Sequence, residues 1–142
     1  MADARIRAAR ITPPEEFFGF KLGSDRKIAR WDKITEYFYK LESESDRIKV
    51  KELGKSTEGN PFLLVIISSP ENLAKLEHYR QVNSRIADPR GLSNEEVRQL
   101  VQEGKAVVCQ TMSLHATEIG GTQMAPELAY DLLSCDSCTT KQ

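Results

Sequence analysis

One short stretch of the sequence carries the residue types of a metal site: His115 and Glu118, which are three positions apart. They follow an apolar run, 106–112, that is typical of a buried strand, so both side chains can aim at one point beyond the end of that strand. Zinc accepts imidazole nitrogen and carboxylate oxygen at about 2.0–2.2 Å, and zinc held in this way activates water. The spacing alone leaves an alternative open, in which an exposed histidine precedes a glutamate that the dipole of a following helix favours.

A second group that could do chemistry is Cys135-Asp-Ser-Cys138, which has the spacing of a redox pair or of half a metal site. The pair ends a predicted helix instead of opening one, and Cys109 alone does not supply a second pair. The favoured interpretation is therefore two incidental small residues at the end of a helix.

Two glycine-containing stretches remain. Gly54-Lys-Ser-Thr57 is similar to the end of a phosphate-binding loop, but position 49 is lysine instead of glycine, and the turn residues that lead to Pro61 prevent a helix from following. That interpretation is rejected. Gly120-Gly121 either lets the backbone approach another group closely or forms an ordinary loop into a helix, and the ordinary loop is slightly favoured. The sequence contains no GxSxG and no HExxH, which removes serine-hydrolase and thermolysin-type sites.

Apolar periodicity indicates which elements position these groups. The segment from Pro13-Pro14 is predicted to be extended, after a loose tail over 1–12. The remaining predicted elements are a helix over 27–43, strands over 47–53 and 62–68 forming a hairpin, a helix from Pro70 to Ile86, a helix that the Ser93/Glu96 capping box starts and Gly104 ends, a buried strand over 106–112, and a helix over 121–133. Strand 62–68 is expected to be buried on both faces. This order predicts an α/β domain with a mixed sheet.

Length and charge exclude several classes of protein. The chain has 142 residues, which suits one domain, and its net charge of -1 argues against a general nucleic-acid binder. The longest apolar run, 62–67, is far too short to cross a membrane. No apolar stretch of signal-peptide length follows the first residues.

Taken together and in order, five stretches resemble the N-terminal part of the zinc carboxypeptidase (metallocarboxypeptidase) family, and within it a subgroup of bacterial zinc peptidases. The stretches are Pro14-Glu-Glu-Phe-Phe-Gly-Phe20, Gly23-Ser-Asp-Arg26 with Trp31-Asp32, Gly54-Lys-Ser-Thr-Glu-Gly59, Ser68-Ser-Pro-Glu-Asn72, and Ser113-Leu-His-Ala-Thr-Glu118 leading into Gln123-Met124. Asn60 and Pro126 depart from the pattern of the family.

The resemblance implies an α/β/α sandwich over 13–142 and a zinc peptidase that releases a C-terminal residue from a peptide or protein. It implies that His115 and Glu118 are the first two zinc ligands. The third ligand, a histidine, the general-base glutamate and the carboxylate-binding arginine of the family lie further along than Gln142. We therefore expect a truncated and catalytically inert chain, with no catalytic residue of its own. The resemblance also implies a secreted or periplasmic protein, although no signal is seen.

The second interpretation is a non-enzymatic interaction module on the same fold. An exposed strand at the edge of a sheet favours pairing with another chain, so self-association through such an edge is expected. No nucleic-acid partner and no transmembrane segment are expected.

Overall fold

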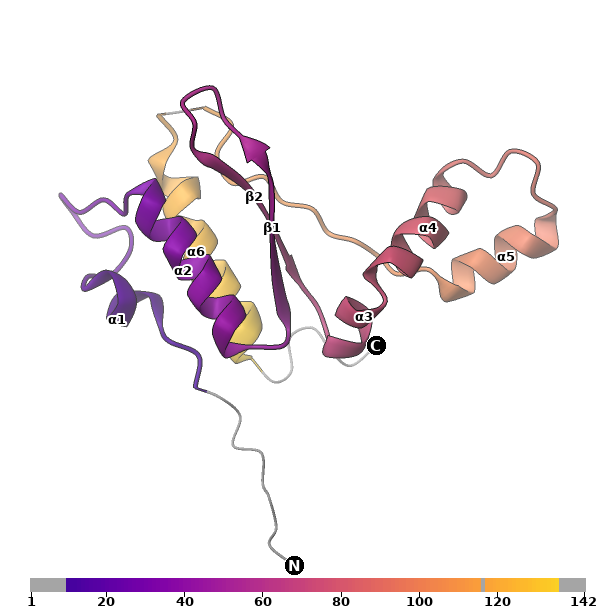
Figure 1. The fold of residues 1–142 in the computed structure, drawn as a ribbon, viewed down its shortest axis with the longest axis horizontal. Helices are drawn as coiled ribbons and strands as arrows, with labels where there is room; N and C mark the ends of the chain where they lie inside the picture. Colours follow the sequence, from indigo (N-terminus) through magenta and orange to yellow (C-terminus); the bar gives the residue numbers. More distant parts are fainter. Residues whose placement is uncertain (1–9, 116, 136–142) are drawn as a thin grey trace, which may run out of the picture. The chain divides into compact units, whose positions relative to one another are not determined.

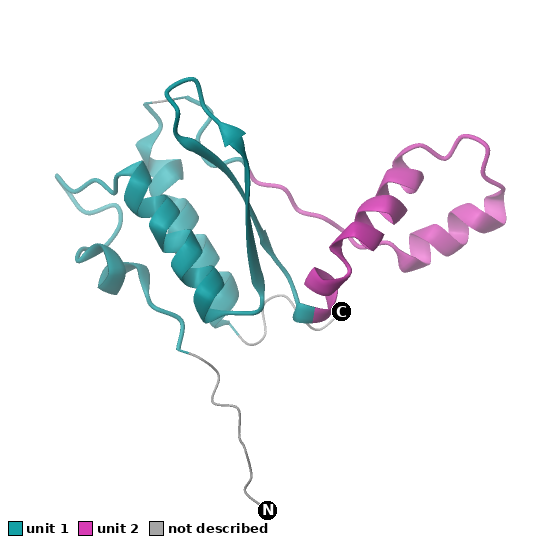
Figure 2. Cartoon of the chain, viewed as in Figure 1, with its two compact units in different colours: residues 1–70, 111–142 teal, residues 71–110 magenta. Residues whose placement is uncertain are grey.

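The structure is a computed structural model that describes residues 10–115 and 117–135. The chain divides into two compact units, shown in Figure 2. Unit 1 contains the described residues within 1–70 and 111–142, and unit 2 contains residues 71–110. None of the helices in the described ranges is both long enough and apolar enough to cross a membrane.

Unit 1 places two long helices against one face of a β-hairpin. It contains α1 (Pro14–Phe18), α2 (Trp31–Glu44), β1 (Ile48–Lys55), β2 (Pro61–Ile67) and α6 (Ile119–Ser134). Helices α2 and α6 lie side by side, and both contact the hairpin (Figure 1). Their contact buries one apolar cluster, made of Leu22, Ala29, Ile34, Tyr37, Phe38, Leu41, Ile48, Ala129 and Leu133. Apolar residues at three- and four-residue steps along α2 produce this buried face.

The hairpin is antiparallel, and its two faces have different surroundings. Ile48 pairs with Ile67 and Val50 with Val65, and these side chains pack on the helices. Side chains alternate between the faces of a strand, so the intervening residues of β2 lie on the other face. There Phe62 is 61% exposed. The prediction that this strand is buried on both faces is wrong, because helices of unit 1 cover only the face that carries Val65.

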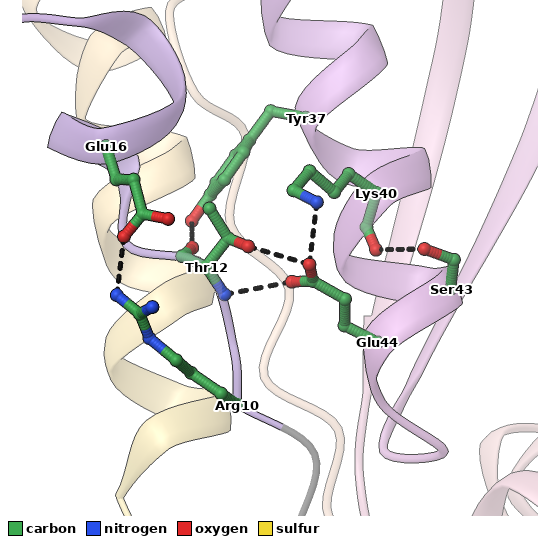
Figure 3. Close-up of polar contacts among 7 residues, drawn as sticks. All are labelled: Arg10, Thr12, Glu16, Tyr37, Lys40, Ser43 and Glu44. Carbon is green, nitrogen blue, oxygen red and sulfur yellow. Dashed lines mark hydrogen bonds and ion pairs between the residues drawn. The ribbon is translucent and has the colours of Figure 1, made fainter.

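The segment before α1 is attached to the end of α2 (Figure 3). The Thr12 amide and hydroxyl donate to the two Glu44 carboxylate oxygens at 2.9 and 2.7 Å. The Tyr37 hydroxyl donates to the Thr12 carbonyl at 2.7 Å. Of the predicted tail 1–12, residues 1–9 lie outside the described residues, and Thr12 is held by these three bonds. The predicted extended start at Pro14 is wrong: Pro14 begins α1, because a fixed φ and a missing N–H suit the first turn of a helix.

Unit 2 is helical, and its core is small. It contains α4 (Leu76–Ala87) and α5 (Asn94–Glu103), and the short helix α3 (Pro70–Ala74) leads into it. The predicted single helix from Pro70 to Ile86 is interrupted at Lys75. The predicted capping box is confirmed, since Ser93 accepts from the Glu96 amide and Glu96 accepts from the Ser93 amide. Val82 is the buried apolar side chain of this unit.

The segment over 106–112 contradicts the prediction of a buried strand. It has no regular structure, and Val107 and Val108 are 76% and 86% exposed. The only strands in the described ranges are β1 and β2, and they pair with each other. An apolar, β-branched run forms a strand only where another strand shares its hydrogen bonds. The residue types alone therefore predicted a strand that has no partner in the described residues.

Candidate metal centre

The structure brings the two predicted ligands together. His115 Nδ1 lies 2.5 Å from Glu118 Oε1, and the two side chains are 68% and 46% exposed. The second carboxylate oxygen of Glu118 accepts from the backbone amides of Leu114 and His115, at 2.8 and 3.1 Å. The carboxylate is therefore oriented by the backbone on one side and by imidazole on the other. The imidazole and the carboxylate are hydrogen-bonded to each other, and both are exposed to solvent.

These contacts fix the charge of the carboxylate. The hydrogen bond from the His115 side chain, followed by those from the His115 and Leu114 amides, lowers the pKa of Glu118 below its ordinary value. A glutamate is ordinarily ionised at neutral pH, and these contacts further favour the ionised form that binds a metal. Ionised oxygen and imidazole nitrogen are ligands that zinc prefers, so the pair fits two positions of a zinc site.

The start of α6 closes this loop from the other side. The Ser113 hydroxyl donates to the Glu118 carbonyl, and its oxygen lies 2.9 Å from the Thr122 hydroxyl oxygen. A Cβ atom at Gly121 would lie 3.0 Å from Ser113 Oγ and 3.1 Å from Ser113 N. Gly121 is thus a position of close approach, which corrects the interpretation of the glycine pair as an ordinary loop. Sequence reasoning missed Ser113 and Thr122, because only the approach at Gly121 gives them a shared role.

The other residues considered from the sequence do not join this site. His78 Nε2 pairs with Glu103 at 2.8 Å inside unit 2. Cys135 follows the last turn of α6, and Cys138 lies outside the described residues. Gly54-Lys-Ser-Thr57 forms the end of β1 and the hairpin turn, with no helix after it, in agreement with its rejection as a phosphate loop. No third metal ligand accompanies the pair, since the described ranges contain no group of three or more His, Cys, Asp or Glu side chains that could hold a metal ion.

Comparison with protein families identifies a match for most of the chain. A family model described as zinc carboxypeptidase matches residues 34–141, well over half of the chain. The matched range contains His115 and Glu118, most of α2, all of α6 and all of unit 2. No curated protein and no solved structure matches the chain.

Proposed function

The chain belongs to the zinc carboxypeptidase family, and from that premise we propose that it provides part of a zinc peptidase site, with His115 and Glu118 as two of the metal ligands. The reaction is hydrolysis of a peptide bond, usually the C-terminal one, in a peptide or protein. One observation carries this proposal: the imidazole of His115 and the carboxylate of Glu118 lie side by side in one exposed loop, joined by a hydrogen bond of 2.5 Å that a zinc ion would replace. The helices of unit 1 on one face of the hairpin would be one side of the family's α/β/α sandwich.

Each side chain has a separate task in this proposal. Zinc, when bound, polarises the scissile carbonyl and lowers the pKa of its water. To bind zinc, His115 would present a nitrogen lone pair and Glu118 an ionised oxygen, so the pair would supply one negative charge to the ion. The amides of Leu114 and His115 hold the carboxylate in place before any metal arrives. Both side chains are exposed, so a zinc ion from solvent can reach them.

We propose further that these 142 residues alone do not hydrolyse peptides. Catalytic zinc sites use three protein ligands and an open position for water. The described residues supply two ligands, and no cluster among them provides the third. The ion would accordingly bind weakly, and no side chain of the described site lies ready to take a proton from its water.

Zinc titration of the untagged chain tests the ligand assignment. The sequence contains two histidines, so imidazole NMR resonances report on each separately. We expect zinc to shift the His115 ring and to leave the His78 ring unchanged. The His115→Ala variant should lose the zinc-dependent changes, whereas His78→Ala, which removes the other paired histidine, should keep them. Equal shifts of both rings, or unchanged binding in His115→Ala, would contradict the assignment.

A peptidase assay tests the proposed inertness. We expect no zinc-dependent release of a C-terminal residue from short peptides by the 142-residue chain. Release that disappears in the Glu118→Gln variant would show that the chain completes a catalytic site without a further segment, and the proposal of inertness would fail.

A second candidate function is a non-catalytic interaction module. Two observations favour it: β1 and β2 pair only with each other in the described part of the chain, so each keeps an edge without a partner strand, and Phe62 beside one edge is 61% exposed. We propose that a second copy of the chain pairs with this sheet at an exposed edge. Sedimentation over a concentration series should then show a dimer, and Phe62→Ser should weaken it about tenfold or more. A monomer at all concentrations would exclude this pairing.

A further inference from the structure

Ser113 has a backbone conformation that needs an explanation. Its φ is 69°, in the left-handed region that residues with a Cβ rarely adopt. Such a conformation is unfavourable in a non-glycine residue and persists only where the surroundings impose it. Here the surroundings are contacts with α6: the hydroxyl donates to the Glu118 carbonyl and contacts the Thr122 hydroxyl. The conformation therefore belongs to a link between the loop and the helix.

Gly121 makes this link sterically possible, and Gly120 provides the contrast. A Cβ at Gly121 would lie 3.0 Å from Ser113 Oγ and 3.1 Å from Ser113 N, so either the serine or the helix would have to shift. At Gly120 a Cβ would meet nothing within 4 Å. Both glycines are in α6, but only one of them faces the loop.

The link sets the geometry of the two ligands. It ties Ser113, which precedes the ligand loop, to the Glu118 carbonyl at its end. With both ends held, the amides of Leu114 and His115 point at the same carboxylate oxygen of Glu118. The other carboxylate oxygen is then left facing the His115 ring. A shift of Ser113 would move both amides and release the carboxylate.

We propose that Ser113, Thr122 and Gly121 are positioning residues that preset His115 and Glu118 for the metal ion. This inference rests on the proposed function, because it concerns the same two ligands. Groups that orient metal ligands from behind commonly change metal affinity by about 10- to 100-fold when they are replaced.

The glycine pair provides the first test. Gly121→Ala should weaken zinc binding at least about tenfold. Gly120→Ala makes the same chemical change one residue earlier and should leave the affinity within about threefold of the unchanged chain. Both substitutions favour the helix to a similar extent, so helix propensity does not separate them. Binding is read from the zinc dependence of the His115 ring resonances, and the melting temperature of each metal-free variant shows that it folds.

The hydroxyl provides the second test, with rescue by a conservative variant. Thr122→Val keeps the shape of the side chain and removes the hydroxyl, so zinc binding should weaken. Thr122→Ser keeps the hydroxyl and should bind like the unchanged chain. A loss that merely reflects disturbed packing would be larger in Thr122→Ser, which removes a methyl group, and that order of effects would overturn the inference.

A metal-free measurement separates this inference from the proposed function. Hydrogen exchange at the amides of Leu114 and His115 should be faster in Gly121→Ala and unchanged in Gly120→Ala. If zinc shifts neither histidine of the unchanged chain, the proposed function fails, and the exchange rates still decide the positioning role. If zinc binds at His115 but the two alanine variants bind and exchange alike, the positioning role fails and the ligand assignment stands.

Discussion

Each of the two units carries one histidine–glutamate pair, and the pairs differ in what holds them. In unit 2, His78 and Glu103 come from two helices and are joined by one contact of 2.8 Å between half-exposed side chains. In unit 1, His115 and Glu118 come from one loop, and the carboxylate also accepts two backbone amides. The same two residue types thus form a surface ion pair in one place and an oriented pair of donors in the other. Backbone donors, rather than the pairing itself, distinguish the second arrangement from the first.

The units also differ in the depth of their cores. Unit 1 buries an apolar cluster between α2, α6 and the hairpin, whereas the buried apolar side chain of unit 2 is Val82. A loop that must hold its geometry benefits from attachment to the deeper core, because buried elements open rarely and exposed ones often. The loop that contains His115 is attached in this way through α6, which contributes Ala129 and Leu133 to the cluster.

The largest predicted effect tests the difference in core depth. Leu41→Ala removes a fully buried side chain of unit 1 and should lower the free energy of unfolding by about 2–5 kcal/mol. Val82→Ala, in unit 2, should cost about 1–2 kcal/mol, because it removes less buried apolar surface. Hydrogen exchange of the α2 and α4 amides reports the two effects separately. If Leu41→Ala and Val82→Ala lowered the protection of the α2 amides equally, the two cores would not be separate.

The next effect depends on pH. Burial raises the pKa of Glu44, but hydrogen bonds from Lys40 and Thr12 and the charge of Lys40 outweigh it and leave the pKa below its ordinary value. A carboxyl with a lowered pKa in the folded state stabilises the fold above its ordinary pKa, and this stabilisation disappears as pH falls through the folded pKa. Glu44→Gln should therefore lose about 1 kcal/mol at neutral pH.

The control compares how the free energy of unfolding depends on pH in the unchanged chain and in Glu44→Gln. Denaturant unfolding from about pH 6 down to about pH 3 should show the difference between the unchanged chain and Glu44→Gln shrinking as the pH falls. A difference that stays constant over this range would mean that the charge of Glu44 contributes nothing to the attachment of Thr12.

A smaller and local effect is expected at the start of α5. Ser93→Ala removes the confirmed capping box and should destabilise α5 by about 1 kcal/mol. Ser43→Ala is the matched control, because the Ser43 hydroxyl bonds only the Lys40 carbonyl within the exposed part of α2. Exchange at the first amides of α5 should rise in Ser93→Ala alone. Unchanged exchange there would show that the packing of α5 against α4, and not the cap, fixes its start.

The smallest effect is expected for the pair in unit 2. Glu103→Gln breaks a half-exposed ion pair with His78, and such pairs contribute about 0–1 kcal/mol. The melting temperature should therefore hardly change.

Glu118→Ala, in contrast, should speed exchange at the Leu114 and His115 amides, because their acceptor is removed. If amide exchange near the two pairs changed to a similar extent, the two pairs would not differ in how their carboxylates are held.

Local chemistry explains which parts of the fold could be predicted. The capping box at Ser93, the helix that contains Leu41 and the hairpin around the 54–61 turn depend on neighbours in sequence, and the structure confirms all three. The helix over 121–133 is confirmed as α6, which begins two residues earlier. The break at Lys75 was not predicted, because the apolar spacing continues across it and gives no stop signal.

Predictions that needed a distant partner failed for a common reason. Val107 and Val108 have the residue types of a strand, yet no strand in the described part of the chain pairs with them. Phe62 belongs to an apolar strand, yet helices cover only the opposite face of the hairpin. Residue type reports the propensity for burial or pairing, whereas the presence of a partner depends on the whole fold.

The sequence by itself determined helices α2, α5 and α6, the hairpin, the family resemblance and the identity of the two candidate ligands. The tertiary structure alone decided that His115 and Glu118 face one another, that the Leu114 and His115 amides orient the carboxylate, and that Gly121 lets Ser113 approach α6. The physical reason is the distance along the sequence over which each kind of interaction acts. Caps, turns and helical periodicity act over a few residues, while the direction of a side chain and the room for a close approach depend on atoms that the folded chain brings together.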